Sequence, residues 1–310
     1  MVGKTVTLIA GVCLVAACSK QTERGPSGIL GEEAKAVATV AFTEGPTVDA
    51  GGIVYFSEIA GARIMRYSAG KGVSVFRENS HGANGLVFDR QWRLVACESS
   101  PPRVTRTDLQ TGRIKVLADG YEGKPFVGPN DVTFDGNGRL YFTDLPGEAV
   151  YRIDVDGKLS RILSAPAIER PNGIIISPDD RTLYHVEANQ GQGGARMIRA
   201  YDLAEDGTVS HMRVFHNFYP GRSADGLSID AEGNVYAAAG LNRSRGTSET
   251  LDTPPGIHVF SPQGKLLHYY PIYEDTITNC AFGGSDLKTL YVTAGKTLFE
   301  IRTAVAGTRR

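Results

Sequence analysis

Residues 129–142 read PNDVTFDGNGRLYF, and this stretch decides the fold because the chain repeats its pattern six times. A polar residue, often followed by glycine, opens a run of alternating apolar residues; an Asp/Gly turn and a second apolar run then follow. Close copies are 84–95 (NGLVFDRQWRLV) and 224–236 (ADGLSIDAEGNVY). Short alternating runs predict β-strands, and the turns between them predict hairpins.

The repeat length indicates the architecture. Successive copies lie roughly 40–55 residues apart, and two further strand-like runs follow each pair, such as 63–67 and 73–76. Four strands per repeat, six times, predict an all-β fold: a six-bladed β-propeller with four-stranded blades. The sixth copy lacks a fourth strand of its own. The strand-like run 35–42, which precedes the first copy, is expected to complete the last blade and close the ring.

Composition excludes several classes of protein. Of the 310 residues, 41% are hydrophobic and 22% are charged, which is enough apolar material for a core. The 37 glycines follow no strict period, so they indicate many tight turns rather than a collagen-like chain. The net charge is −1 and no long basic block occurs, so we expect no nucleic-acid partner.

The N-terminus has the features of a targeting segment. Lys4 precedes a short apolar run that ends LVAAC at residues 14–18, which resembles a bacterial lipobox. We expect a signal peptide over 1–17, lipid attachment at Cys18 and a polar tether over 18–34. The propeller would span 35–304, followed by a tail over 305–310. An ordinary secretory signal cleaved near Ala17 is the alternative.

These features place the protein at the cell envelope, on its periplasmic or extracellular face. Membrane contact would occur only through the lipid anchor, and we expect a monomer. Cys97 and Cys280 are then the cysteines of the globular part. Two buried free thiols are expected there, with a long-range disulfide as the alternative.

The polar residue that opens each copy forms a column. In a propeller the first strand of each blade lines the central channel, so equivalent positions form a ring around the axis. The column consists of Glu44, Asn84, Asn130, Asn172, Asp225 and Asn279. Two carboxylates and four amides suit a hard divalent cation. The alternative is that Asn-Gly and Asp-Gly pairs only form turns, although Glu44 is hard to explain in that way.

Other residues are expected at the same face. In an antiparallel blade the second strand ends beside the start of the first. The two longest connections, within 187–199 and 241–256, both follow a second strand and should overhang the column. Glu98, Asp144 and Glu187 should reach this face too.

Several stretches resemble the gluconolactonase/regucalcin (senescence marker protein) family, here in the form of a bacterial lipoprotein member. They are FTEGP (42–46), GPNDV (128–132), RPNG (170–173) and ADGLSID (224–230), supported by YFTD (141–144) and LYVTAG (290–295). The resemblance covers about 40–303, nearly the whole mature domain. It implies a six-bladed propeller that binds a catalytic divalent metal and hydrolyses a small-molecule sugar lactone.

The resemblance also implies residue roles. Glu44, Asn172 and Asp225 match the family's metal ligands, and Asn130 matches a residue that either ligates the metal or contacts substrate. Asp225 also matches the proposed general base. We add Asn84 and Glu98 to Asn130 as the expected substrate-binding set. The implied cofactor is one divalent cation, with Ca²⁺ the first choice and Mg²⁺, Mn²⁺ or Zn²⁺ as alternatives.

Two departures leave the substrate open. The Pro-Pro in ESSPPR (98–103) and the two long connections differ from the family pattern where substrate would lie. A non-catalytic, envelope-tethered binding or scaffold propeller and a related metal-dependent esterase therefore remain as alternative functions.

Overall fold

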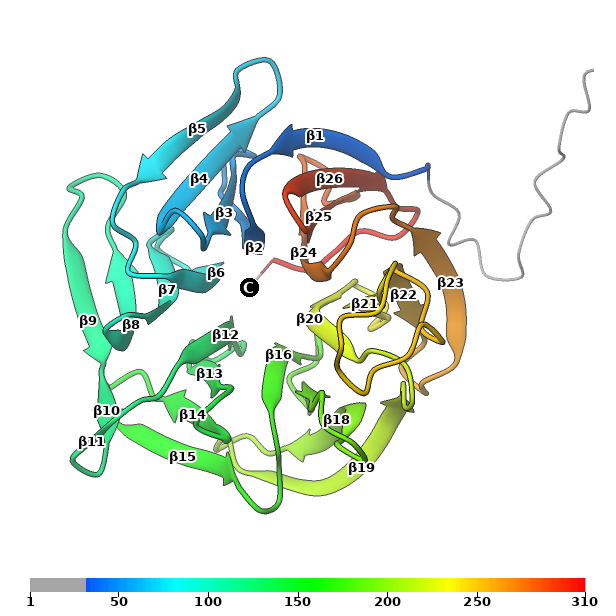
Figure 1. The fold of residues 1–310 in the computed structure, drawn as a ribbon. Coiled ribbons are helices and arrows are strands. Elements are labelled where there is room, and N and C mark those ends of the chain that lie inside the picture. Colours follow the sequence, from blue (N-terminus) through cyan, green and yellow to red (C-terminus); the bar gives the residue numbers. More distant parts are fainter. Residues whose placement is uncertain (1–31, 310) are drawn as a thin grey trace, which may run out of the picture.

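The computed structural model describes residues 32–309, which form six four-stranded antiparallel sheets arranged around a central channel (Figure 1). The predicted six-bladed propeller is confirmed. Residues 1–31, and with them the predicted signal peptide and Cys18, lie outside the described residues. Across 32–309, no helix is long and apolar enough to span a membrane.

The blades follow one another along the chain. The first blade consists of β2 (Thr43–Val48), β3 (Val54–Glu58), β4 (Arg63–Ser68) and β5 (Gly72–Arg77). The second consists of β6 (Ala83–Phe88), β7 (Leu94–Ser99), β8 (Pro102–Thr107) and β9 (Ile114–Ala118). The third consists of β12 (Pro129–Phe134), β13 (Leu140–Asp144), β14 (Ala149–Ile153) and β15 (Leu159–Ser164). The fourth blade consists of β16 (Pro171–Ile176), β17 (Thr182–Ala188), β18 (Arg196–Leu203) and β19 (Val209–Asn217). The fifth consists of β20 (Ala224–Ile229), β21 (Val235–Ala239), β22 (Gly256–Phe260) and β23 (Leu266–Pro271).

The sixth blade joins the two ends of the propeller. It consists of β24 (Ile277–Gly283), β25 (Thr289–Ala294), β26 (Thr297–Arg302) and β1 (Lys35–Thr39). Strand β1 pairs antiparallel with β26, as the sequence predicted, and it ends at Thr39 rather than at Phe42. Because the first strand of the domain completes the last sheet, the ring closes through backbone hydrogen bonds. A small hairpin, β10 (Gly120–Tyr121) and β11 (Lys124–Pro125), was not expected.

The core is divided into apolar layers between neighbouring blades. At the closing interface, Val54 and Phe56 of β3 pack with Tyr291 and Leu298 of the sixth blade. Inward-facing residues of the middle strands fill each layer, which explains the repeated Leu-Tyr-Phe and Val-Tyr runs. Cys97 and Cys280 are buried in two of these layers as free thiols, so the free-thiol prediction is confirmed.

A β-bulge marks the polar column in every blade. The pairing of the first and second strands shifts register next to the polar residue, for example between Glu44 and Thr47 and between Ala224 and Leu227. The same shift occurs in the other four blades. A bulge re-aims the side chain it carries. Bulges at one level therefore present the polar residues of the first five blades to the same end of the channel. In the sixth blade the aligned residue is Thr278, so the prediction that Asn279 belongs to the column is wrong.

The glycine after the polar residue allows neighbouring first strands to approach. A Cβ on Gly226 would lie 2.0 Å from Cγ of Asn279, and one on Gly85 would lie 2.6 Å from Oδ1 of Asp131. These Asn-Gly and Asp-Gly pairs lie inside strands β6, β16 and β20, so the interpretation that they only form turns is wrong.

Candidate functional site

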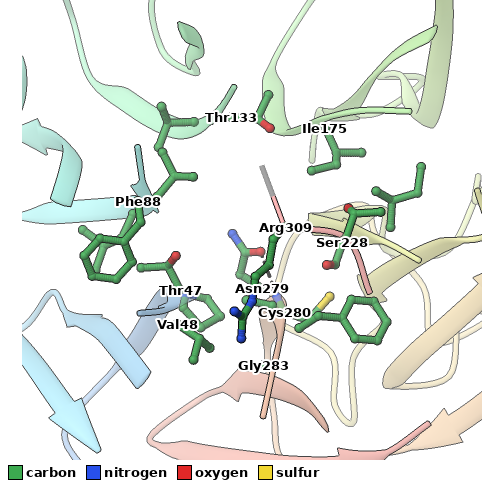
Figure 2. A pocket seen from close by; sticks show the side chains of 18 of the residues that line it. Thr47, Val48, Phe88, Thr133, Ile175, Ser228, Asn279, Cys280, Gly283 and Arg309 are labelled. Carbon is green, nitrogen blue, oxygen red and sulfur yellow. Dashed lines mark hydrogen bonds between the residues drawn. The ribbon is translucent and has the colours of Figure 1, made fainter. Parts of the chain in front are cut away.

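The first strands of the six blades surround the channel. Figure 2 shows a cavity within this channel, lined by Thr47, Phe88, Thr133 and Ser228 from four different blades. The cavity measures about 140 Å³, which is room for a few water molecules. Arg309, near the C-terminus, lines the cavity as well.

The polar column lies at the end of the channel where the first strand of each blade begins, which we call the upper end. Glu44, Asn172 and Asp225 are buried, with 6–8% of their surface exposed, while Asn84 and Asn130 are half-buried at the equivalent positions. In the sixth blade Asn279 lies one residue deeper, level with Asp131 and Gly226. Nδ2 of Asn172 donates to Oδ1 of Asp225 at 2.6 Å, which joins the fourth and fifth blades. The candidate ligands from different blades therefore converge.

Asp225 has a second partner that sequence reasoning missed. Nη2 of Arg222 donates to its Oδ2 at 2.5 Å, and the Arg222 side chain is only 8% exposed. Both oxygens of Asp225 are thus held in place by hydrogen bonds. Arg222 lies three residues before Asp225 in a connection, where no motif marks it.

Glu44 lacks such a partner. Its carboxylate accepts a hydrogen bond from its own neighbour, the N–H of Gly45, at 3.1 Å. Burial, together with the negative charge of Asp225, raises the pKa of Glu44 well above its usual value. Two like charges confined in this way are relieved by a proton or by a metal cation between them.

Asp131 forms the floor of the site and was also missed. Nδ2 of Asn279 donates to its Oδ2 at 3.3 Å, and this bond joins the third and sixth blades across the channel. Burial raises the pKa of Asp131 to about 7. The sequence did contain a signal: Asp131 stands where other copies have the close-approach glycine.

The acidic residues at the ends of the second strands have protein partners. Oε1 of Glu98 accepts from Arg77 and Thr105, and Oε2 accepts from Arg103. These bonds engage both oxygens and tie the first blade to the second, so they favour a structural role. The predicted contact between Glu98 and substrate stays a prediction.

Asp144 and Glu187 behave similarly. Asp144 accepts from the N–H groups of Val127 and Gly128, and Glu187 accepts from those of Glu169 and Arg170. Each carboxylate thereby anchors the segment that leads into the first strand of its own blade. Such anchors help to hold the bulges in position.

The two long connections lie at the same end and are tied together. The fully buried guanidinium of Arg196 donates to the carbonyls of Asn189, Gly191 and Pro220 at 2.6–3.0 Å, and to the carbonyl of Ser248 at 3.2 Å. Ser248 in turn donates its N–H to the carbonyl of Gln190. The connections β17–β18 and β21–β22 therefore form one structure, which we call the stapled loops (189–195 and 240–255).

Comparisons with known proteins identify the family of this chain. Residues 42–296 match the model of the SMP-30/gluconolactonase/LRE-like region. The chain belongs to this family. The gluconolactonase of Zymomonas mobilis is 26% identical over 305 residues, which cover 86% of this chain and 80% of the relative.

Two solved structures extend the comparison. The gluconolactonase of Xanthomonas campestris matches with a TM-score of 0.75 at 26% identity, covering 87% of this chain and 89% of that one. Regucalcin from Agrobacterium tumefaciens, a calcium-binding protein, matches with a TM-score of 0.71 at 20% identity, covering 87% and 93%. The latter similarity shows the fold alone.

The residues of this SMP-30/gluconolactonase/LRE-like chain fit a hard cation. Within 32–309, no group of three or more His, Cys, Asp or Glu side chains could hold a metal ion by itself. The predicted donors are instead two carboxylates, Glu44 and Asp225, with the amides of Asn130 and Asn172. An oxygen-only set of this kind suits Ca²⁺ or Mg²⁺. The unpaired carboxylate of Glu44 is the observation that favours a bound cation.

Proposed function

We propose that this protein hydrolyses a sugar lactone to the corresponding aldonic acid, with one divalent cation held at the upper end of its channel. Membership of the SMP-30/gluconolactonase/LRE-like family supports a gluconolactonase-like hydrolase acting on lactone esters. The observation that carries the proposal is the convergence of Glu44 and Asp225, two buried carboxylates from different blades, beside a single guanidinium.

Four side chains would hold the cation: Glu44, Asn130, Asn172 and Asp225. Asn172 now directs Nδ2 toward Asp225, and a half-turn of its carboxamide would present Oδ1 to the same space. Ca²⁺ is the first candidate because all the donors are oxygens.

The proposed chemistry divides between the cation and the chain. When bound, the cation would act as a Lewis acid that polarises the lactone carbonyl. Asp225 would act as the general base and take a proton from water as the water oxygen bonds to the carbonyl carbon. The ring C–O bond then breaks, and the proton passes from Asp225 to the departing ring oxygen, which leaves a hydroxyl and a carboxylic acid. Asn130 and Asn84, both half-buried, would bind the sugar hydroxyls.

A substrate panel with and without chelator tests the proposal. Acid release from glucono-1,5-lactone should stop with EDTA and return with Ca²⁺. Cation binding without turnover of any lactone or ester would instead indicate a non-catalytic propeller. Turnover of simple esters but not of lactones would indicate a related metal-dependent esterase.

We also propose that the chain is a monomer tethered to the cell envelope through a lipid on Cys18. The support is the LVAAC stretch at 14–18 and the polar segment that follows it. The tether would leave the propeller free to meet a small substrate outside the cytoplasm.

A further inference from the structure

Arg222 is buried next to a candidate ligand. It lies in the connection between β19 and β20, and its Nη2 contacts Oδ2 of Asp225 at 2.5 Å. Two further carboxylates, those of Glu249 and Glu44, lie close enough to interact electrostatically with its guanidinium. Glu249 comes from the stapled loops and is itself 5% exposed. Arg222 is therefore a fixed positive charge surrounded by the acidic groups of the site.

The bonding of Arg222 differs from that of a structural arginine. Arg196 uses all three guanidinium nitrogens to bind carbonyls of the loops. Nη1 of Arg222, in contrast, is buried and has no hydrogen-bond partner within the described part of the chain. A buried guanidinium with one ion-pair partner ties few segments together, so its main effect on the site is electrostatic.

We propose that Arg222 is a positioning residue that holds Oδ2 of Asp225, leaves Oδ1 for the cation, and lowers the affinity of the site for that cation. This inference rests on the proposed function, because it concerns the same metal site. A guanidinium that shares a carboxylate with a divalent ion repels that ion over a few ångströms of low-dielectric surroundings. The ion would then be held less tightly than by the same oxygen ligands alone.

Isothermal titration of the full chain with Ca²⁺ tests the proposal. Arg222→Gln should bind Ca²⁺ at least about tenfold more tightly than the unmodified protein, which corresponds to ~1.4 kcal/mol. Its kcat for glucono-1,5-lactone should fall, because Asp225 loses the bond that orients it. Arg222→Lys, which keeps the charge, should bind Ca²⁺ nearly as weakly as the unmodified protein.

Arg139→Gln is the matched control. Arg139 is also buried and also contacts an aspartate, Asp135, at 2.5 Å, but at the opposite end of the third blade. Its removal should leave Ca²⁺ affinity unchanged. Unchanged or weaker binding by a cooperatively folded Arg222→Gln would overturn the proposal.

If Arg222→Gln does not fold, Glu249→Gln provides a second test of the proposal. Glu249→Gln removes a carboxylate that offsets Arg222, so Ca²⁺ binding should weaken, and unchanged binding would overturn the inference. Binding by Arg222→Gln but not by the unmodified protein would support the inference and refute the metal part of the proposed function. Ca²⁺ binding without lactone turnover would refute only the proposed reaction. No binding by any of these proteins would overturn both.

Discussion

Nδ2 of Asn172 lies 2.6 Å from Oδ1 of Asp225, so a side chain of the fourth blade directly contacts one of the fifth. The two residues are far apart in sequence, and each sits at the bulge that opens the first strand of its blade. The contact shows that neighbouring blades build one site jointly.

Asp225→Asn should keep the fold and lose nearly all lactonase activity. Loss of a general base costs roughly 10²- to 10⁴-fold in rate, and the amide preserves the size of the side chain. Steady-state kinetics and circular dichroism check the two parts. Asp230→Asn is the control, since Asp230 is also buried but follows the far end of β20, and it should stay active. Retention of most activity by Asp225→Asn would refute its role as base.

Glu44→Gln should abolish stabilisation by Ca²⁺. A cation that binds only the folded state stabilises it by about 2.7 kcal/mol at a concentration of 100 times Kd. Thermal melts with and without Ca²⁺ measure this effect. Asn84→Ala, at an equivalent position not assigned as a ligand, should keep the Ca²⁺-dependent rise in Tm. An equal rise in Glu44→Gln would count against the metal site.

The cation-free protein should lose stability between about pH 4 and pH 7 through Asp131. Its pKa of about 7 in the folded state exceeds the ordinary value, so the folded state binds the proton more strongly. The stabilisation is complete below the unfolded pKa and is lost as pH rises through the folded one. Asp131→Asn should remove this part of the pH dependence, of the order of a few kcal/mol.

Melting temperatures measured from pH 4 to pH 8 in EDTA check this prediction, with both proteins compared at each pH. The difference between them separates Asp131 from Glu44, whose pKa burial raises, and from His216 and His258, whose pKa values burial lowers. Parallel curves for the two proteins would contradict it.

Arg196→Met should loosen the stapled loops while the propeller stays folded. The substitution leaves the carbonyls of Asn189, Gly191 and Pro220 without their shared donor. Hydrogen exchange should rise in 189–195 and 240–255, and KM should increase more than kcat falls. Arg213→Met, which removes an exposed ion pair with Asp202, provides the control. Unaltered exchange in both loops would show that Arg196 does not hold them.

Cys18→Ser should release the protein from membranes. Without the thiol no lipid can be attached, and the polar tether has no apolar segment to replace it. Fractionation of cells and mass spectrometry of the N-terminal peptide measure the change. If the unsubstituted protein is already found in the soluble fraction, an ordinary secretory signal is favoured instead.

The propeller could be read from the chain because each blade is a local repeat. Alternating apolar runs joined by short turns specify hairpins, and six similar hairpin pairs can bury their apolar faces only against one another. Closure by β1 was predictable because the sixth copy lacked a fourth strand. The hairpin β10–β11 was not, since two-residue strands leave no periodic pattern.

The sequence by itself determined the fold, the polar column and the candidate ligands Glu44, Asn130, Asn172 and Asp225, because repetition aligns equivalent positions. Only the tertiary structure decided what surrounds them: Arg222 against Asp225, Asp131 beneath them, and Arg196 joining the loops. The tertiary structure also shows that Glu98 forms ion pairs with Arg77 and Arg103. The physical reason is that most of these contacts join segments that are distant in the chain, such as Asp131 with Asn279. Arg222 and Asp225 are only three residues apart, but the path of the connection before β20 decides that their side chains meet.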